Sequence, residues 1–188
     1  MIIAIIVLVI IVVLVILAVV GFNKLRQADV SAQEALGGID VQLTRRADLV
    51  PNLVETVKGY AKHESGVFEA VTEARAQVNK AAASGTVDEK AAAEAALDKS
   101  LINVMAVAEQ YPDLKASQNF LQLQDQSADT ENQLAFARQY YNESVRALNT
   151  AIVTFPSMLF VGMAGVTKQE FYEVPDASQR IAPNIGFN

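Results

Sequence analysis

The chain has 188 residues, of which 15 are Lys or Arg and 21 are Asp or Glu, so its formal net charge is −6. This acidic balance, with no basic cluster larger than Arg45 and Arg46, argues against a nucleic-acid partner. Gly and Pro are sparse, Trp is absent, and Ala, Leu, Glu, Gln and Lys are abundant, which is typical of an all-α protein.

Residues 2–20 form an apolar run without one charge, hydroxyl or amide. A helix of this length covers about 29 Å, close to the hydrocarbon thickness of a bilayer. Fourteen of these residues are Ile or Val, which favour strands in water, but in lipid the backbone must satisfy its own hydrogen bonds and becomes helical. We therefore expect residues 1–21 to be a transmembrane helix and the protein to be a single-pass protein of the cell membrane, in contact with lipid.

A cleaved secretory signal is the alternative interpretation of this run. No Lys or Arg precedes the run, and it is longer than an ordinary signal-peptide core, so retention of the helix is favoured. The first positive charges after it are Lys24 and Arg26. Since Lys and Arg remain in the cytoplasm, we expect the amino terminus outside and the body of the protein in the cytoplasm.

A seven-residue apolar repeat follows from residue 22 to residue 78, and it predicts one long helix with a seam for a bundle or coiled coil. Polar residues interrupt this seam at Asp29, Arg46 and Glu64. Pro51 falls inside the repeat. Because the repeat keeps its phase there, a kink is favoured over the alternative, a break at which Asp48 caps a new helix.

The remainder of the body predicts two more helices. Residues 81–86 end the first helix, with Gly85 expected as a left-handed terminator, and Asp88 and Glu89 open a second helix that stops at Pro112. A third helix runs from Asp113 to Pro156. Residues 22–156 are thus expected to fold as an elongated antiparallel bundle, of three helices if the first is continuous and of four if it breaks at Pro51.

Beyond Pro156, residues 157–188 change in character. The first part is an apolar patch that consists of Met158, Leu159, Phe160, Val161, Met163 and Val166. It is too short to span a bilayer, so we expect it to contact the membrane surface or another copy of the chain. From Lys168 the chain reads as an extended tail, because Pro175 and Pro183 discourage helix.

Two segments carry a resemblance to a known family. Residues 39–64 read IDVQLTRRADLVPNLVETVKGYAKHE, and residues 124–142 read QDQSADTENQLAFARQYYN, followed later by Phe155 and Pro156. These blocks resemble the signature blocks of the LemA family, bacterial membrane proteins with one amino-terminal span and a helical-bundle domain. The resemblance covers nearly the whole chain and implies this fold and a membrane location, but it implies no defined biochemical activity.

Polar residues in these blocks suggest a buried network. Arg46 lies on the apolar seam, and one side of the last helix carries Glu131, Asn132, Arg138 and Asn142. A buried charge without a partner costs several kcal/mol, whereas a paired one fixes helix register, so we predict a structural polar network. The alternative is a ligand-binding groove at the same place.

Sites for catalysis or for a metal are not indicated. His63 is the only histidine, Val67 stands where a zinc-protease helix needs a second His, and Tyr60 stands where a di-iron bundle needs Glu. We expect His63 to be a solvated or hydrogen-bonded residue on a helix. The Ser and Thr residues lack an identifiable base, and Cys is absent, so no catalytic residue, metal or cofactor is expected.

These features favour a non-enzymatic, membrane-anchored helical scaffold that self-associates into a homo-oligomer and organises partners, such as other membrane proteins, or shapes the bilayer. The alternative function is a binding or sensor module whose C-terminal apolar segment docks on the membrane or on a partner protein.

Overall fold

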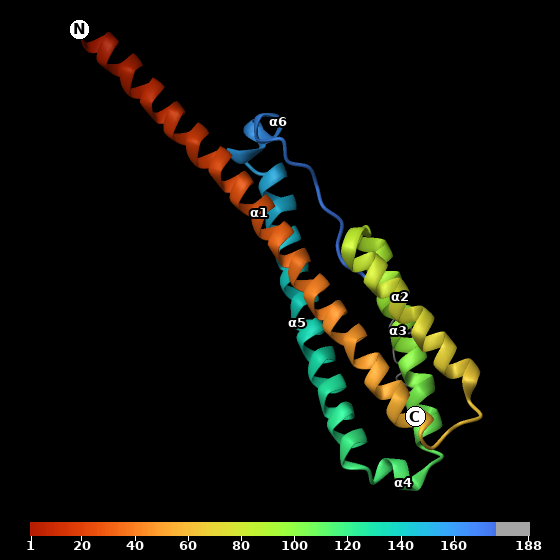
Figure 1. Cartoon of the computed structure of the whole chain (residues 1–188). Coiled ribbons are helices and arrows are strands. Elements are labelled where there is room, and N and C mark those ends of the chain that lie inside the picture. The colour runs from red at the N-terminus through yellow and green to blue at the C-terminus, as the bar shows by residue number, and fades with distance from the viewer. Residues whose placement is uncertain (176–188) are drawn as a thin grey trace, which may run out of the picture. The chain divides into compact units, whose positions relative to one another are not determined.

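The computed structural model of the chain describes residues 1–175, and it confirms the all-α class. Four helices are long: α1 (Ile2–Lys58), α2 (Ser65–Ser84), α3 (Val87–Ala108) and α5 (Gln118–Val153) (Figure 1). Three short elements complete the described part: α4 (Pro112–Lys115), the 3₁₀ turn η1 (Ser157–Phe160) and α6 (Val161–Ala164). The predicted tail residue Pro183 lies outside the described residues.

The chain divides into two compact units. The first unit combines Met1–Ile39 with Phe136–Phe171, and the second combines Asp40–Ala135 with the chain from Tyr172 onward. Because α1 and α5 are each one continuous helix, both helices contribute to both units.

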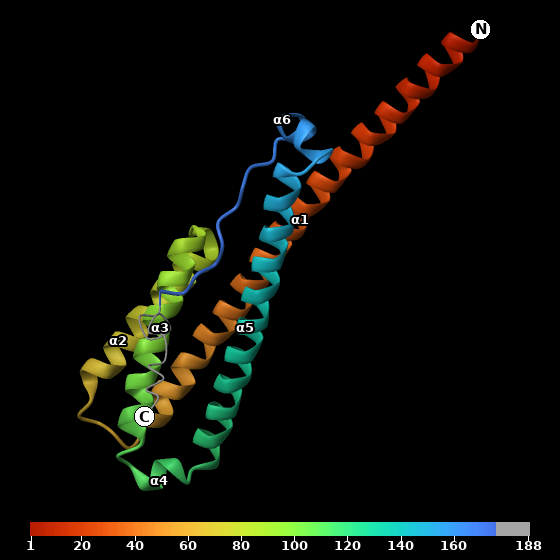
Figure 2. The ribbon, with the colours of Figure 1, turned by 180° about the vertical axis from the view of Figure 1, so that it is seen from behind.

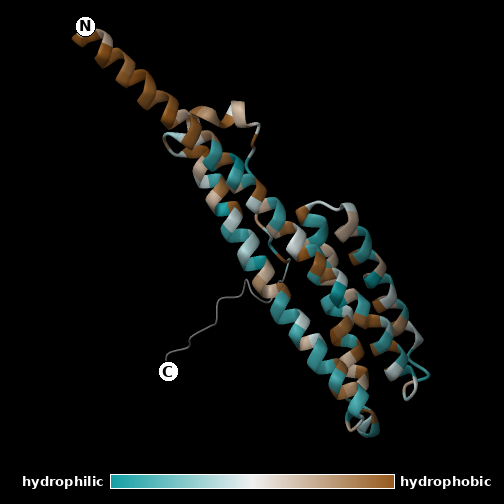
Figure 3. Cartoon of the chain, turned by 60° about the vertical axis from the view of Figure 1, so that its left-hand side comes forward, coloured by the Kyte–Doolittle hydropathy of each residue, from teal (hydrophilic) through white to brown (hydrophobic). Residues whose placement is uncertain are grey.

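In the first unit, the amino-terminal part of α1 is long and apolar enough to cross a membrane, and its most apolar window is 0% buried. Figure 3 shows this part of the helix as a continuous apolar segment (Figure 3). The first buried residue along the chain is Gly21, directly after the apolar run ends at Val20. The Ile and Val side chains of the run therefore have no protein cover within the first unit.

In the second unit, parts of the four long helices and the short α4 surround one core. Helix α2 packs against α3, and both ribbon views show α2 antiparallel to its neighbours α1 and α3 (Figure 2). The predicted seam supplies the α1 side of this core, where Leu43 and Val57 are fully buried. The other helices bury Phe68, Val71, Val78, Leu97, Val104, Leu114, Phe120 and Leu134.

Helix α1 ends earlier than the repeat predicts. It stops at Lys58, and the amides of Tyr60 and Ala61 both donate to the Val57 carbonyl oxygen at 3.0 and 2.9 Å before α2 begins at Ser65. The predicted continuous helix to residue 78 is therefore wrong. Antiparallel helices that face one core repeat their apolar residues at the same spacing as one continuous helix, so the repeat alone did not reveal the turn.

Pro51 lies inside α1, so the alternative of a break capped by Asp48 is also wrong. Proline has no amide hydrogen, so the carbonyl of Ala47, four residues earlier, receives no helical hydrogen bond from it. Ala47 is fully buried, and a buried carbonyl without a partner is costly. Arg75 of α2 supplies the missing donor, since its Nε lies 3.0 Å from the Ala47 carbonyl oxygen.

The turn between α2 and α3 differs from the expected one. Gly85 has φ −77° and ψ 156°, so it is extended and not the predicted left-handed terminator. A Cβ atom there would lie 2.7 Å from the Ala81 carbonyl oxygen, so the glycine is explained by close packing. Thr86 begins α3 with a capping box, because its hydroxyl accepts from the Glu89 amide and the Glu89 carboxylate accepts from the Thr86 amide.

The predicted third helix is interrupted after its first turn. Pro112 starts α4, which ends at Lys115, and α5 begins at Gln118. Leu114 and Phe120 are both buried, yet a continuous helix would place side chains six residues apart about 120° from each other around its axis. The break lets both side chains face the core.

After α5 the chain turns sharply in the first unit. A cis Phe155–Pro156 peptide precedes η1, and Gly165 ends α6 with φ +64°, a left-handed conformation that favours glycine. Residues 166–175 form neither helix nor strand. Within the first unit, Gln169 and Glu170 are held to α5. Asn149 forms a pair of hydrogen bonds with the Gln169 backbone, and the Tyr141 hydroxyl donates to the Glu170 carbonyl oxygen at 2.9 Å.

The Pro51 contact gives a double-mutant prediction. Replacing Arg75 with Met should lower the free energy of unfolding by about 1–2 kcal/mol, because the Ala47 carbonyl loses a charged donor. In a Pro51→Ala background the alanine amide satisfies the same carbonyl, so the cost of Arg75→Met should fall by about half or more. Urea unfolding of the four proteins in detergent, followed by circular dichroism, measures the difference; equal costs in both backgrounds would contradict this account.

The Tyr141 contact predicts a pH dependence. Burial, and secondarily the charge of Glu170, raises the pKa of Tyr141 above its ordinary value of 10.0. The folded state therefore holds the phenol proton more tightly than the unfolded state, and this stabilisation is complete below about pH 10 and lost as pH rises further. Tyr141→Phe should cost about 1 kcal/mol at neutral pH and flatten the loss of stability above about pH 10. Tyr140→Phe, with an exposed side chain, is the control at neutral pH.

Candidate functional site

A buried arginine joins three helices in the second unit. Arg46 of α1 forms ion pairs through Nη1 with Asp98 of α3 and with Glu131 of α5, the latter at 2.7 Å. Its side chain is 9% exposed, whereas those of Asp98 and Glu131 are 31% and 39% exposed. The cation is thus the desolvated member of the cluster, and the two carboxylates reach it from the rim.

The other three predicted network residues lie at different places along α5. Asn132 is exposed, because it follows Glu131 by one residue and so points about 100° away around α5. Arg138 and Asn142 are half-buried and belong to the first unit. Of the predicted set, Arg46 and Glu131 are brought together in a direct ion pair.

Two buried charges on α3 were not anticipated. Lys90 is 4% exposed; its ammonium pairs with Asp40 of α1 and lies 3.4 Å from the Ala82 carbonyl oxygen of α2. Glu94 is fully buried and accepts a hydrogen bond of 2.7 Å from the Tyr172 hydroxyl. Both residues fall on the apolar stripe of α3. A charged residue on such a stripe could have been recognised from the sequence as a buried charge.

These three buried charges all join segments that are distant in the sequence. Arg46, Lys90 and Glu94 each contact at least one segment distant in sequence, so their charges are neutralised or hydrogen-bonded within the fold. Among residues 1–175, no group of three or more His, Cys, Asp or Glu side chains could hold a metal ion. His63 is exposed in the turn between α1 and α2, so its predicted place on a helix is wrong.

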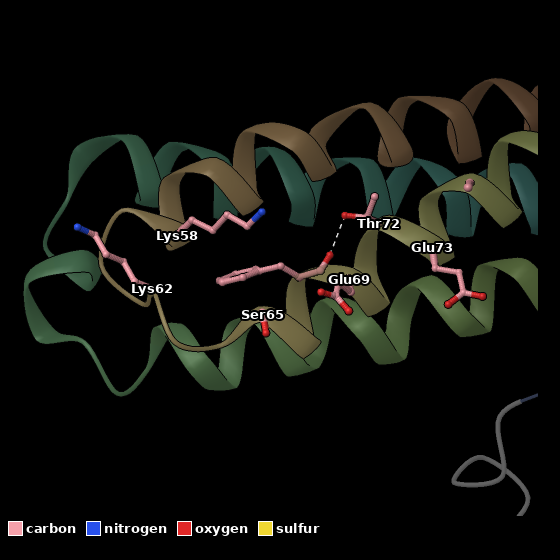
Figure 4. A pocket seen from close by; sticks show the side chains of 8 residues that line it. Lys58, Lys62, Ser65, Glu69, Thr72 and Glu73 are labelled. Carbon is pink, nitrogen blue, oxygen red and sulfur yellow. Dashed lines mark hydrogen bonds between the residues drawn. The ribbon is translucent and has the colours of Figure 1, made fainter.

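An open groove of about 610 Å³ lies at the end of α1 in the second unit. Figure 4 shows Lys58 and Lys62 at one end of it and Glu69 and Glu73 along α2 (Figure 4). The Lys58 ammonium lies 5.3 Å from the centre of the Phe68 ring, a cation–π contact. The groove therefore presents both signs of charge.

The predicted apolar patch is divided between outward and inward side chains. Met158, Leu159 and Met163 are 49%, 65% and 75% exposed, whereas Val166 is buried. Phe160 and Val161 are half-buried. Phe155, which lies outside the predicted set, is 72% exposed and extends the patch.

Phe160 connects the patch to α1. A Cβ atom on Gly21 would lie 2.8 Å from a ring carbon of Phe160, so a larger residue there would have to displace the Phe160 ring. The patch therefore lies against the turn of α1 that directly follows the apolar run.

Comparison with known proteins agrees with this architecture. The family model described as "LemA family" matches residues 35–187. The chain belongs to the LemA family. A curated relative, the magnetosome protein MamQ of Magnetospirillum gryphiswaldense, is 22% identical over 179 residues, which cover 82% of this chain and 66% of the relative. Family membership and the apolar helix together indicate a membrane-associated helical protein.

The Arg46 cluster predicts an unequal effect of two neighbouring substitutions. Arg46→Met keeps most of the side-chain volume but removes two ion pairs with carboxylates, so the free energy of unfolding should fall by about 1–3 kcal/mol. Arg45→Met is the matched control, because exposed Arg45 makes only a 3.0 Å hydrogen bond to Gln133 and its loss should cost less than about 0.5 kcal/mol.

Urea unfolding of both variants in detergent tests this prediction. Adding Glu131→Gln to Arg46→Met should recover part of the loss, since one of the two carboxylates that faced the lost cation is then neutral. An Arg46→Met protein that unfolds like the Arg45→Met protein would show that the cluster does not stabilise the fold and would favour the binding-groove alternative.

Proposed function

We propose that this protein is a non-enzymatic, membrane-anchored helical scaffold that self-associates into a homo-oligomer on the membrane. The uncovered apolar run at the start of α1 supports the anchor, because nineteen apolar residues without protein cover need lipid around them. A scaffold that is anchored and oligomeric can organise other membrane proteins or shape the bilayer.

A pair of exposed aromatic side chains in the first unit supports self-association, and it is the observation on which the proposal depends. Phe136 is 71% exposed and Tyr140 is 58% exposed, one turn apart on α5. Exposed aromatic residues are enriched where proteins bind one another, since they bury much apolar area at low entropic cost.

A groove of about 400 Å³ lies beside this pair, between α1 and α5 of the same unit. Small side chains line much of it, and its lining consists of Lys24, Gln27, Ala28, Ser31, Tyr140, Glu143, Ser144 and Ala147. Because pair and groove adjoin on one face, two copies related by a two-fold axis would each place an aromatic side chain in the other's groove.

The absence of enzymatic activity is proposed from the roles of the buried charged groups. Arg46, Lys90 and Glu94 all contact other helices or segments of the chain, and such contacts fix helix register. The orientation with the body in the cytoplasm is likewise a proposal, supported by Lys24 and Arg26 directly after the apolar run. The alternative function, a binding or sensor module, shares the same anchor.

Single cysteines test self-association cleanly, because the natural chain has none. Phe136→Cys should form disulfide-linked dimers in native membranes under mild oxidation. Ile102→Cys is the matched control: Ile102 is 67% exposed on α3 of the second unit and is not part of the proposed surface, so this variant should remain monomeric on a denaturing gel.

Mass measurement completes the test. The wild-type protein in mild detergent should have a multiple of its 20.3 kDa chain mass, and Phe136→Ser with Tyr140→Ser should shift the protein to the monomer. A wild-type particle that is strictly monomeric at all concentrations, with no Phe136→Cys crosslink, would contradict the proposal.

A further inference from the structure

We infer that the apolar patch is a second membrane contact, in which Phe155, Met158, Leu159 and Met163 enter the headgroup boundary of the bilayer that holds α1. These four side chains are between 49% and 75% exposed, and they come from one short segment of the first unit. The inference depends on the anchor but not on self-association.

The depth of the patch follows from the Gly21 contact. Phe160 packs directly on Gly21, and both ribbon views show α6 beside α1. Residues 2–20 cover about 29 Å, so when they span the hydrocarbon, Gly21 lies at its edge. A group packed against Gly21 then lies within the zone of about 5–10 Å in which interfacial helices bury their apolar side chains.

The orientation of the segment suits the same position. The segment Ser157–Ala164 is bent by 84° from Gln118–Val153. In the first unit α5 runs antiparallel to α1 (Figures 1 and 2), so a segment perpendicular to α5 also lies across the axis of α1. When α1 crosses the bilayer, the patch therefore lies along the membrane surface, with its exposed side chains able to enter lipid.

The charges around the patch favour a lipid surface as its occupant. No Asp or Glu occurs between Glu143 and Glu170, whereas Lys24 is exposed one turn beyond Gly21 and Lys168 follows the patch. Anionic headgroups attract Lys and Arg near the membrane surface and repel carboxylates. A short, acid-free, apolar segment with flanking lysines is thus complementary to the boundary of an anionic bilayer.

Single tryptophans test the contact, because the natural chain has no Trp. Full-length Phe155→Trp and Met163→Trp proteins would be reconstituted into vesicles of phosphatidylcholine and phosphatidylglycerol, with bromine atoms near the carbonyl or near the chain end of the lipid. Quenching should be at least about twofold stronger with the shallow bromines than with the deep ones, as expected for interfacial side chains. Val30→Trp, at an exposed position of α1 ten residues and so about 15 Å beyond Val20, should not be quenched by either lipid.

A second pair of variants tests the role of Gly21 in setting the depth. Gly21→Leu should displace the Phe160 ring and weaken the shallow quenching of Met163→Trp, whereas Val20→Leu, one residue earlier at an exposed position, should leave it unchanged. Circular dichroism would confirm that both proteins remain folded.

Two outcomes would overturn the inference. If the patch faced water, Phe155→Trp and Met163→Trp would be as insensitive to brominated lipid as Val30→Trp. If another copy of the chain covered the patch, their emission would shift to the blue with rising protein concentration and without lipid quenching. Because lipid quenching is expected from a monomer as well as from an oligomer, this result is independent of the crosslinking and mass measurements.

Discussion

The constraint on which the structure depends is the uncovered apolar surface of residues 2–20. Other parts of the protein pack against the rest of α1, but nothing in the structure covers this run. Lipid is the solvent in which an all-apolar helix of this length is stable. Protein cover begins at Gly21, where the run ends. The apolar patch lies at this boundary, because Phe160 packs on Gly21. The first charged residue, Lys24, comes directly after it.

The buried charges show a second constraint, which acts between helices. An apolar seam alone leaves helices free to slide by a turn, since one Leu or Val layer resembles the next. Arg46 and Lys90 remove this freedom, because each buried cation must meet its carboxylates and only one register of α1 against α3 and α5 allows both. We therefore expect these residues to specify which packing forms as well as to stabilise it.

The sequence predicted those features that depend on periodicity and composition. Residue spacing along a helix determines which side chains share a face. It therefore predicted the all-α class, the apolar helix and the buried position of Arg46 on the seam. The end of α1 at Lys58 and the interruption before Gln118 were missed because each depends on which distant residues share the core. Lys90 and Glu94 were missed for the same reason, since their partners Asp40 and Tyr172 lie far away in the chain.

The lipid contact and the proposed contact between copies occupy different levels of the first unit, so both can form at once. Tyr140 precedes Val153, the end of α5, by 13 residues, or about 20 Å along the helix. The interfacial zone is only about 5–10 Å deep, so Phe136 and Tyr140 lie beyond it when the patch is within it. Their exposed rings then face water, and removing them from water by association with another copy is favourable. A membrane contact at the patch therefore leaves the aromatic pair as the apolar surface available to a second chain.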